Sequence, residues 1–325
     1  MVGKMILKKD FNVNLAQFGI DIPLGERMDI ILDHLTSNYS DNIYYPNDFQ
    51  NLRLTKDDVL LAHTNIYVEE LLGDNIDRIM RNCYELDLHG DKEPRLDFRP
   101  LRDLILREAY YTYQGMKLAI QHGFCYFLGG GMHHAMSFSG RGFCLINDIV
   151  IGAKKLMREH LIKKVWVIDV DAHKGDGTSE ICYQDSNFFT LSIHMQYAWP
   201  LCGKNPGDPE MIPSNIDIPV GLNEERNYLA KLSAGLNKLE KEGLPKPELA
   251  IVVDGADPYE EDELPGTSGL KLTKTQMLAR DQMIYRFLQS NHIPMLFVMG
   301  GGYGKKAGQI YIQFLDWLLK QRSCE

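Results

Sequence analysis

The chain contains 325 residues, of which 44% are hydrophobic and 24% charged, and its formal net charge is −9. These proportions are those of an ordinary globular protein, and the negative charge argues against a dominant contact with nucleic acid. No apolar stretch approaches the roughly 20 residues of a membrane span, and residues 1–11 lack the apolar core of a signal peptide. The six cysteines lack Cys-x-x-Cys spacing and do not suggest a disulfide framework, so we expect a reducing, cytoplasmic location.

Short apolar runs alternate with amphipathic segments along most of the chain. The first hundred residues contain two helical patterns, at 27–39 and 55–72, and no clear strand. The later apolar runs predict strands at residues 124–128, 165–170, 189–193, 216–219, 249–253 and 295–299. The later amphipathic segments predict helices at residues 101–121, 147–160, 224–242, 273–291 and 309–320. Gly123 is placed to end the first of these, and Thr273 and Gln276 have the spacing of a capping box.

The predicted strands are apolar at nearly every position, which indicates burial on both faces. Strands of this kind occur in parallel sheets that helices cover on both sides. The alternation of strands and helices therefore predicts one doubly wound α/β domain over residues 1–325.

The most informative segment follows the predicted strand at 165–170 and runs from Asp169 to Gly177, with the sequence DVDAHKGDG. A buried strand thus ends in three carboxylates and an imidazole. Successive strand side chains point to opposite faces, so Asp169, Asp171 and His173 share one side while the strand geometry lasts. Buried carboxylates are costly unless a metal or close hydrogen bonds compensate them. The segment therefore indicates a metal site.

Three further polar loops each follow a predicted strand, at residues 129–134 (GGGMHH), 254–258 (DGADP) and 300–304 (GGGYG). The carboxyl ends of parallel strands open onto one edge of a sheet, so the four loops can converge. Singly they are weak signals: paired histidines are more often structural, and Tyr303 alone could be a packing aromatic. The glycines at 300–302 lack the Lys-Ser/Thr of a phosphate loop. The acidic run at 260–263 is interpreted as a solvated rim.

Taken together, these motifs resemble the histone deacetylase family, which has the arginase/deacetylase fold. The resemblance rests on the loop at 129–134, the Gly-Phe-Cys strip at 142–144, the segment at 169–177, Asp257, and the loop ending in Tyr303. Residues 169–175 and 262–266 are most similar to the class IV (deacetylase 11-like) branch and its bacterial relatives. Residues 1–100 match poorly, and we expect them to form a cap region of the same domain.

The resemblance implies a role for each matched position. Asp171, His173 and Asp257 correspond to three ligands of a catalytic Zn²⁺, and the oxygen-rich set would also suit Fe²⁺. The matched catalytic residues are His133, His134 and Tyr303, with Asp169 holding His133 and Asp176 holding His134. The matched substrate-binding residues are Gly142, Phe143, Trp199 and Leu264. A structural monovalent cation, K⁺ in this family, corresponds to Asp169, Asp171, His173, Ser192 and Ile193.

The implied activity is removal of an acetyl or longer acyl group from acyl-lysine on a peptide or protein. An acetylated polyamine or another acetylated amine is an alternative substrate, although Leu264 stands where polyamine-specific relatives place a glutamate. The same fold would also accommodate an arginase-like ureohydrolase with two metals, or a binding protein without catalysis. No nucleic-acid or membrane partner is expected, and the sequence does not indicate an oligomeric state.

Overall fold

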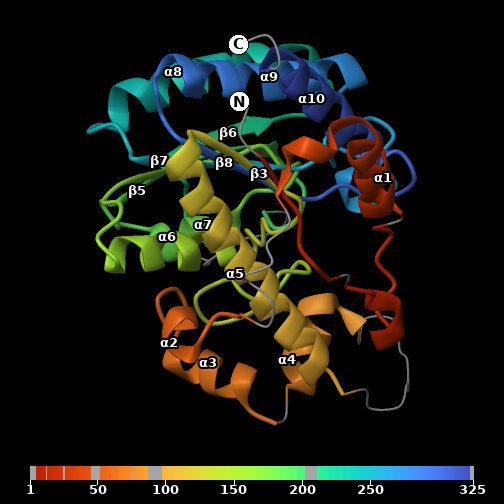
Figure 1. Cartoon of the computed structure of the whole chain (residues 1–325), viewed down its shortest axis with the longest axis vertical. Coiled ribbons are helices and arrows are strands. Elements are labelled where there is room, and N and C mark those ends of the chain that lie inside the picture. Colours follow the sequence, from red (N-terminus) through yellow and green to blue (C-terminus); the bar gives the residue numbers. More distant parts are fainter. Residues whose placement is uncertain are drawn as a thin grey trace.

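A computed structural model describes residues 5–11, 13–24, 26–44, 52–74, 76–86, 97–201 and 211–322. Within these residues the strands form one parallel sheet of eight members in the order β2-β1-β3-β8-β7-β4-β5-β6 (Figure 1). The strands are β1 (Ile6–Leu7), β2 (Ile43–Tyr44), β3 (Phe124–Phe127), β4 (Val165–Asp169), β5 (Phe188–Met195), β6 (Ile216–Val220), β7 (Leu249–Asp254) and β8 (Met295–Met299). The predicted fold class, a single doubly wound parallel sheet flanked by helices, is confirmed.

Helices cover both faces of this sheet (Figure 1). One face packs against α1, α8, α9 and α10, and the other against α5, α6 and α7, with α2, α3 and α4 extending that second layer. The helices are α1 (Arg27–Tyr39), α2 (Lys56–Val59), α3 (Asn65–Leu72), α4 (Asp77–Tyr84), α5 (Arg99–His122), α6 (Asp148–Arg158), α7 (Asp176–Cys182), α8 (Tyr228–Glu242), α9 (Lys274–Ser290) and α10 (Ala307–Arg322).

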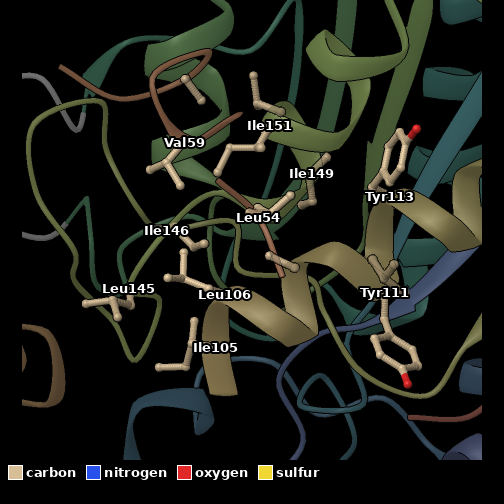
Figure 2. Close-up of a cluster of buried hydrophobic side chains, with 14 of the residues drawn as sticks. Leu54, Val59, Ile105, Leu106, Tyr111, Tyr113, Leu145, Ile146, Ile149 and Ile151 are labelled. Carbon is tan, nitrogen blue, oxygen red and sulfur yellow. The ribbon is translucent and has the colours of Figure 1, made fainter. Parts of the chain in front are cut away.

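The strand side chains alternate between two hydrophobic cores, one on each face. Along β4, Val165 and Val167 belong to the α5–α6 core, whereas Trp166 and Ile168 belong to the core under α8, α9 and α10. Both sets are buried, which explains why the strands read as continuous apolar runs. Figure 2 shows part of the first core, where Ile105 and Leu106 of α5 lie near side chains of the 145–151 segment and of the α2 region.

Local signals explain most of the helix ends. Thr273 caps α9, and its capping box with Gln276 is present as predicted. α5 ends at Gly123, which adopts a left-handed conformation with φ 80°. The predicted helix at 55–72 is wrong in one respect: it is divided into α2 and α3, because Thr64 starts a second helix with its own side-chain cap.

Four elements escaped the sequence analysis. The strands β1 and β2 have only two residues each, too few for a period-2 pattern, yet β1 pairs with both β2 and β3. Helix α4 lies in the segment that showed no clear pattern, and α7 begins inside the polar motif itself at Asp176. Among the described residues, no helix is long and apolar enough to cross a membrane.

Candidate active site

The four polar loops meet at one edge of the sheet because their strands are neighbours. β3, β8, β7 and β4 are adjacent in the sheet order, so their carboxyl ends lie side by side. Hydrogen bonds join the loops directly. Ala256 N–H donates to Gly301 O (2.7 Å), Gly301 N–H donates to Asp171 Oδ2 (2.7 Å), and Ala172 N–H donates to Asp257 Oδ1 (3.0 Å). These bonds join three of the loops, and Met299 N–H at the end of β8 donates to Gly129 O of the fourth (3.0 Å), so the loops form one hydrogen-bonded unit.

Asp171, His173 and Asp257 face one another at the centre of this unit. The Nδ1 atom of His173 lies 3.1 Å from Asp257 Oδ2 and 3.3 Å from Asp171 Oδ1, and all three side chains are buried. Four tetrahedral ligands at zinc distances are separated from one another by about 3.3 Å. The spacing and the donor set, two carboxylates and one imidazole, therefore fit a divalent metal ion of this kind.

The charges in this group are strongly coupled. Burial and, next, the negative charge of Asp171 raise the pKa of Asp257 to about 7. Burial opposes the charged form of His173, but its hydrogen bonds to Asp171 and Asp257 raise its pKa to about 10. Two buried carboxylates that contact one imidazole favour positive charge beside them, and a bound metal ion would supply it.

Two histidine–carboxylate pairs flank the group. His133 Nδ1 lies 2.7 Å from Asp169 Oδ2, and His134 Nδ1 lies 2.6 Å from Asp176 Oδ1, with all four side chains buried. A carboxylate at Nδ1 orients the ring and leaves Nε2 facing away from it. His133 Nε2 is 3.8 Å from Asp171 Oδ1, so the first pair reaches the carboxylate–imidazole group directly.

The two histidines differ in electrostatics. Burial works against the charged form of His133, but the charges of Asp169 and Asp171 raise its pKa to about 9. Burial and the charge of His133 together lower the pKa of His134 to about 4, despite its bond to Asp176. The arrangement therefore favours a cationic His133 beside a neutral His134.

Arg141 is a neighbour of the second pair that the sequence analysis did not identify. Its Nη1 atom lies 3.4 Å from Asp176 Oδ2, a fully buried carboxylate oxygen, and its guanidinium lies 4.8 Å from the ring centre of Trp199. The Trp199 ring in turn meets His134 edge to face at 4.6 Å. Arg141 thus contacts both the Trp199 ring and Asp176, the carboxylate that orients His134.

A cavity of about 620 Å³ adjoins these groups. Both histidines of the pairs line it, as do Asp171, His173, Gly142, Phe143 and Tyr303. The Phe143 ring meets Tyr303 edge to face at 6.4 Å and stacks on Tyr84 at 6.5 Å. Tyr84 belongs to α4, in the segment where the sequence showed no pattern, so nothing in the sequence indicated its position behind Phe143.

The remaining predicted binding positions are not among the residues that line this cavity. Trp199 contacts His134 and His173. Leu264 is half-buried on the loop after β7. Ser192 lies opposite Asp169 in the β4–β5 register, with Ile193 following it, so the positions expected to bind a monovalent cation are neighbours. The roles of all of these residues stay predictions.

Lys174, inside the polar motif, points away from the site. It is 3% exposed, and its Nζ atom donates to Asp217 Oδ1 (2.5 Å) and Ser214 Oγ (3.3 Å) near β6.

Two further carboxylates, not identified from the sequence, hold the loop that carries the paired histidines. Glu108 of α5 accepts Gly130 N–H (3.0 Å), while Asp148 of α6 accepts Gly131 N–H (3.1 Å) and Met132 N–H (2.7 Å). Gly131 has φ 80°, and a Cβ atom there would lie 1.9 Å from Met299 O. Only glycine fits this position, because β8 passes directly behind the loop.

The fold and the site together define a class: a parallel α/β protein with a carboxylate–histidine centre assembled from four strand-end loops. The sequence family described as the histone deacetylase domain matches residues 25–315. The chain therefore belongs to the histone deacetylase family, as the motifs predicted.

Similar proteins agree with this assignment. The chain is 30% identical to an uncharacterized protein of Picosynechococcus sp. over 189 residues, which cover 58% of this chain and 59% of that protein. It is 27% identical to Histone deacetylase 2 of Arabidopsis thaliana over 210 residues, or 65% and 52% of the two chains. The chain thus spans little more than half the length of these curated relatives. The crystal structure of a histone deacetylase homologue from Aquifex aeolicus has a TM-score of 0.69 and 22% identity, covering 94% of this chain and 81% of that one, and shares the fold.

Proposed function

We propose that the protein is a metal-dependent amidohydrolase that removes an acetyl or longer acyl group from the side-chain amine of acyl-lysine. The observation that carries the proposal is the placement of two histidine–carboxylate pairs beside Asp171, His173 and Asp257 on one cavity. Zn²⁺ is the proposed ion, with Fe²⁺ as an alternative, because two carboxylates and one imidazole suit both. Membership of the histone deacetylase family supports the reaction class.

Each group of the site has a use in amide hydrolysis. When bound, Zn²⁺ would acidify a water molecule and polarise the amide carbonyl. His134, whose Nδ1 faces Asp176, keeps Nε2 free to accept the proton of the attacking water and to return it to the leaving amine. His133, held by Asp169, supplies positive charge beside the reacting atoms. The Tyr303 hydroxyl would donate a hydrogen bond to the developing oxyanion.

The surroundings of the cavity favour a lysine side chain as the amine part of the substrate. Phe143 and Trp199 offer aromatic surfaces to an aliphatic chain, and Gly142 directly precedes Phe143 in sequence and lies close to the Trp199 ring. Leu264 places an apolar side chain where the polyamine-specific relatives have a glutamate, which disfavours a polyamine although Glu263 is adjacent. An acetylated polyamine or another small acetylated amine is therefore the second choice.

One observation favours a different function. His133, His134 and Asp171 also bring ligand atoms within 4.8 Å of one another, so a second metal could share Asp171, as in a dimetal ureohydrolase of the arginase type. The two functions differ in metal stoichiometry. Elemental analysis of the purified protein should give one metal per chain for the deacylase, whereas two metals per chain and release of urea from guanidino substrates would favour the ureohydrolase.

Three further assignments belong to the same proposal. The single sheet supports one domain over residues 1–325, the negative net charge argues against nucleic-acid partners, and free buried cysteines are in keeping with a cytoplasmic location. The β4–β5 register supports an inner K⁺ held by main-chain carbonyls of Asp169, Asp171 and His173 with Ser192 and Ile193. Replacement of K⁺ by the larger organic cation tetramethylammonium in the buffer should lower thermal stability if this ion is present.

The test of the proposed function is a panel of acyl-lysine peptides, with acyl chains from two to about fourteen carbons, together with acetylpolyamines. Turnover should stop after dialysis against a chelator and return with Zn²⁺. Asp257→Asn should lose both metal and activity, whereas Asp185→Asn, the same change at a half-buried carboxylate outside the site, should lose neither. Undiminished turnover in chelator, or a full metal complement in Asp257→Asn, would contradict the proposal.

A further inference from the structure

Asp262 is the exception in the acidic run at 260–263: Glu260, Glu261 and Glu263 are exposed, as a solvated rim requires, but the carboxylate of Asp262 points inward. Its Oδ2 atom accepts the N–H of Tyr303 at 2.7 Å. Its Oδ1 atom accepts the N–H of Leu264 at 3.0 Å and the hydroxyl of Thr267 at 2.9 Å. One carboxylate therefore joins the loop after β7, which carries the rim, to the loop after β8, which carries Tyr303.

The rest of the Tyr303 loop is held by its backbone as well. Arg27 donates to Gly302 O (2.5 Å), and Gly304 N–H donates to Pro23 O (2.6 Å). On the side of the acidic run, Glu263 Oε1 accepts the N–H of Lys305 (3.0 Å). These bonds hold the loop on both sides of Tyr303 despite its glycines. Among the described residues, the peptide N–H of Tyr303 donates a hydrogen bond only to Asp262.

We infer that Asp262 is a positioning residue for Tyr303. Its carboxylate fixes the peptide N–H of Tyr303, and this sets where the Tyr303 hydroxyl lies over the cavity. This inference rests on the proposed role of Tyr303 as hydrogen-bond donor. The reason is geometric: an electrostatic donor works only if it is preorganised, and a displacement of about 1 Å can cost roughly 10² in rate. Because the same carboxylate also accepts the N–H of Leu264, it links the position of Leu264 to that of Tyr303.

Removal of the carboxylate should act on turnover rather than on binding. Asp262→Ala should lower kcat about 10²-fold, with KM changed less than about threefold, because the affected donor serves mainly the transition state. Asp262→Asn keeps one carbonyl oxygen and can serve one loop but not both, so it should recover part of the loss. Glu260→Gln is the matched control, since it removes a charge from the same run at an exposed side chain.

A double-mutant cycle separates positioning from a general structural role. If Asp262 acts through Tyr303, then Asp262→Ala in a Tyr303→Phe background should cost less than about threefold further in kcat. A repeat of the full 10²-fold loss in that background would overturn the inference. Normal turnover of Tyr303→Phe would instead contradict the proposed catalytic role of Tyr303, which is a different failure.

A spectroscopic measurement tests whether Asp262 positions the Tyr303 ring, and it does not require an activity assay. Fluorotyrosine incorporated at position 303 should give one narrow ¹⁹F resonance in the otherwise unchanged protein and in the Glu260→Gln variant. The resonance should shift and broaden in Asp262→Asn and Asp262→Ala as the ring samples more than one position. An unchanged resonance in both Asp262 variants would overturn the inference, whether or not an acyl substrate has been found.

Discussion

Gly142 offers a sharp test of the geometry around His134. It has φ 55°, in the left-handed region that favours glycine, and a Cβ atom there would lie 2.4 Å from Trp199 Cη2 and 2.9 Å from His134 Cδ2. Carbon atoms in contact prefer about 3.5–4.0 Å. Gly142→Ala should therefore push the Trp199 ring back by about 1 Å and press on the imidazole of His134.

Gly123 provides a control that isolates the steric part. It also has a left-handed backbone, with φ 80°, but a Cβ atom there would meet nothing within 4 Å. Both alanine variants should lose about 1–2 kcal/mol from the unfavourable backbone conformation. Only Gly142→Ala should also lose turnover, by about 10²-fold, because a catalytic group displaced by about 1 Å loses that much.

The assay compares kcat/KM on the best acyl-lysine peptide with the free energy of unfolding in urea for both variants. Tryptophan fluorescence should change in Gly142→Ala, since the Trp199 ring is moved, and stay unchanged in Gly123→Ala. If Gly142→Ala keeps kcat/KM within about threefold of Gly123→Ala, the contact between this backbone, Trp199 and His134 has no part in catalysis.

Three further perturbations have calculable outcomes. His63 is buried with Nδ1 donating to Met136 O and Nε2 accepting Asn147 N–H, and burial lowers its pKa from 6.5 to about 4. Between pH 6.5 and pH 4 the unfolded chain therefore binds a proton at His63 that the folded protein does not bind. The free energy of unfolding should fall by about 3 kcal/mol as the pH is lowered from 6.5 to 4. In urea titrations His63→Gln should lose this dependence, and the exposed His122→Gln should retain it. Arg141→Met should lower the free energy of unfolding by about 2 kcal/mol, because buried Asp176 loses a facing charge, and Arg141→Lys should lose less. Zn²⁺ added to chelator-treated protein at about 100 times its Kd should stabilise the fold by roughly 2.7 kcal/mol; an unchanged Tm would speak against the metal site.

The sequence predicted the six longer strands but missed the two short strands at one edge of the sheet. Most of the longer strands produce apolar runs because both of their faces are buried, as along β4, whereas the edge strand β6 exposes part of its length. The two-residue strands β1 and β2 produce no such pattern, since the pairing of β2 with β1 and of β1 with β3 joins residues that are distant in the sequence. α7 was hidden because its first residues, from Asp176 onward, are the polar residues of the site itself.

Site residues could be predicted where they belong to a recognisable sequence motif. They could not be predicted where their side chains bind the backbone of a loop that is distant in the sequence. Asp169 and Asp176 belong to a recognisable segment, and the structure pairs them with His133 and His134. Asp262, in contrast, looks like any surface acid within an acidic run, because its partner is a peptide N–H 41 positions away. The class IV branch assignment stays a prediction.

The position of β8 in the sheet has a consequence for the order of assembly during synthesis. β8 lies between β3 and β7, so the loops carrying the paired histidines and Asp257 are separated by a strand made near the C-terminal end of this sequence, at 295–299. A nascent chain that has not yet released this strand from the ribosome can fold β4 onto β7 but cannot close the centre. We expect ribosome-bound chains that stop before residue 295 to show no turnover of an acyl-lysine peptide, because the loop with His133 and His134 is not held beside the β4 and β7 loops until β8 has emerged.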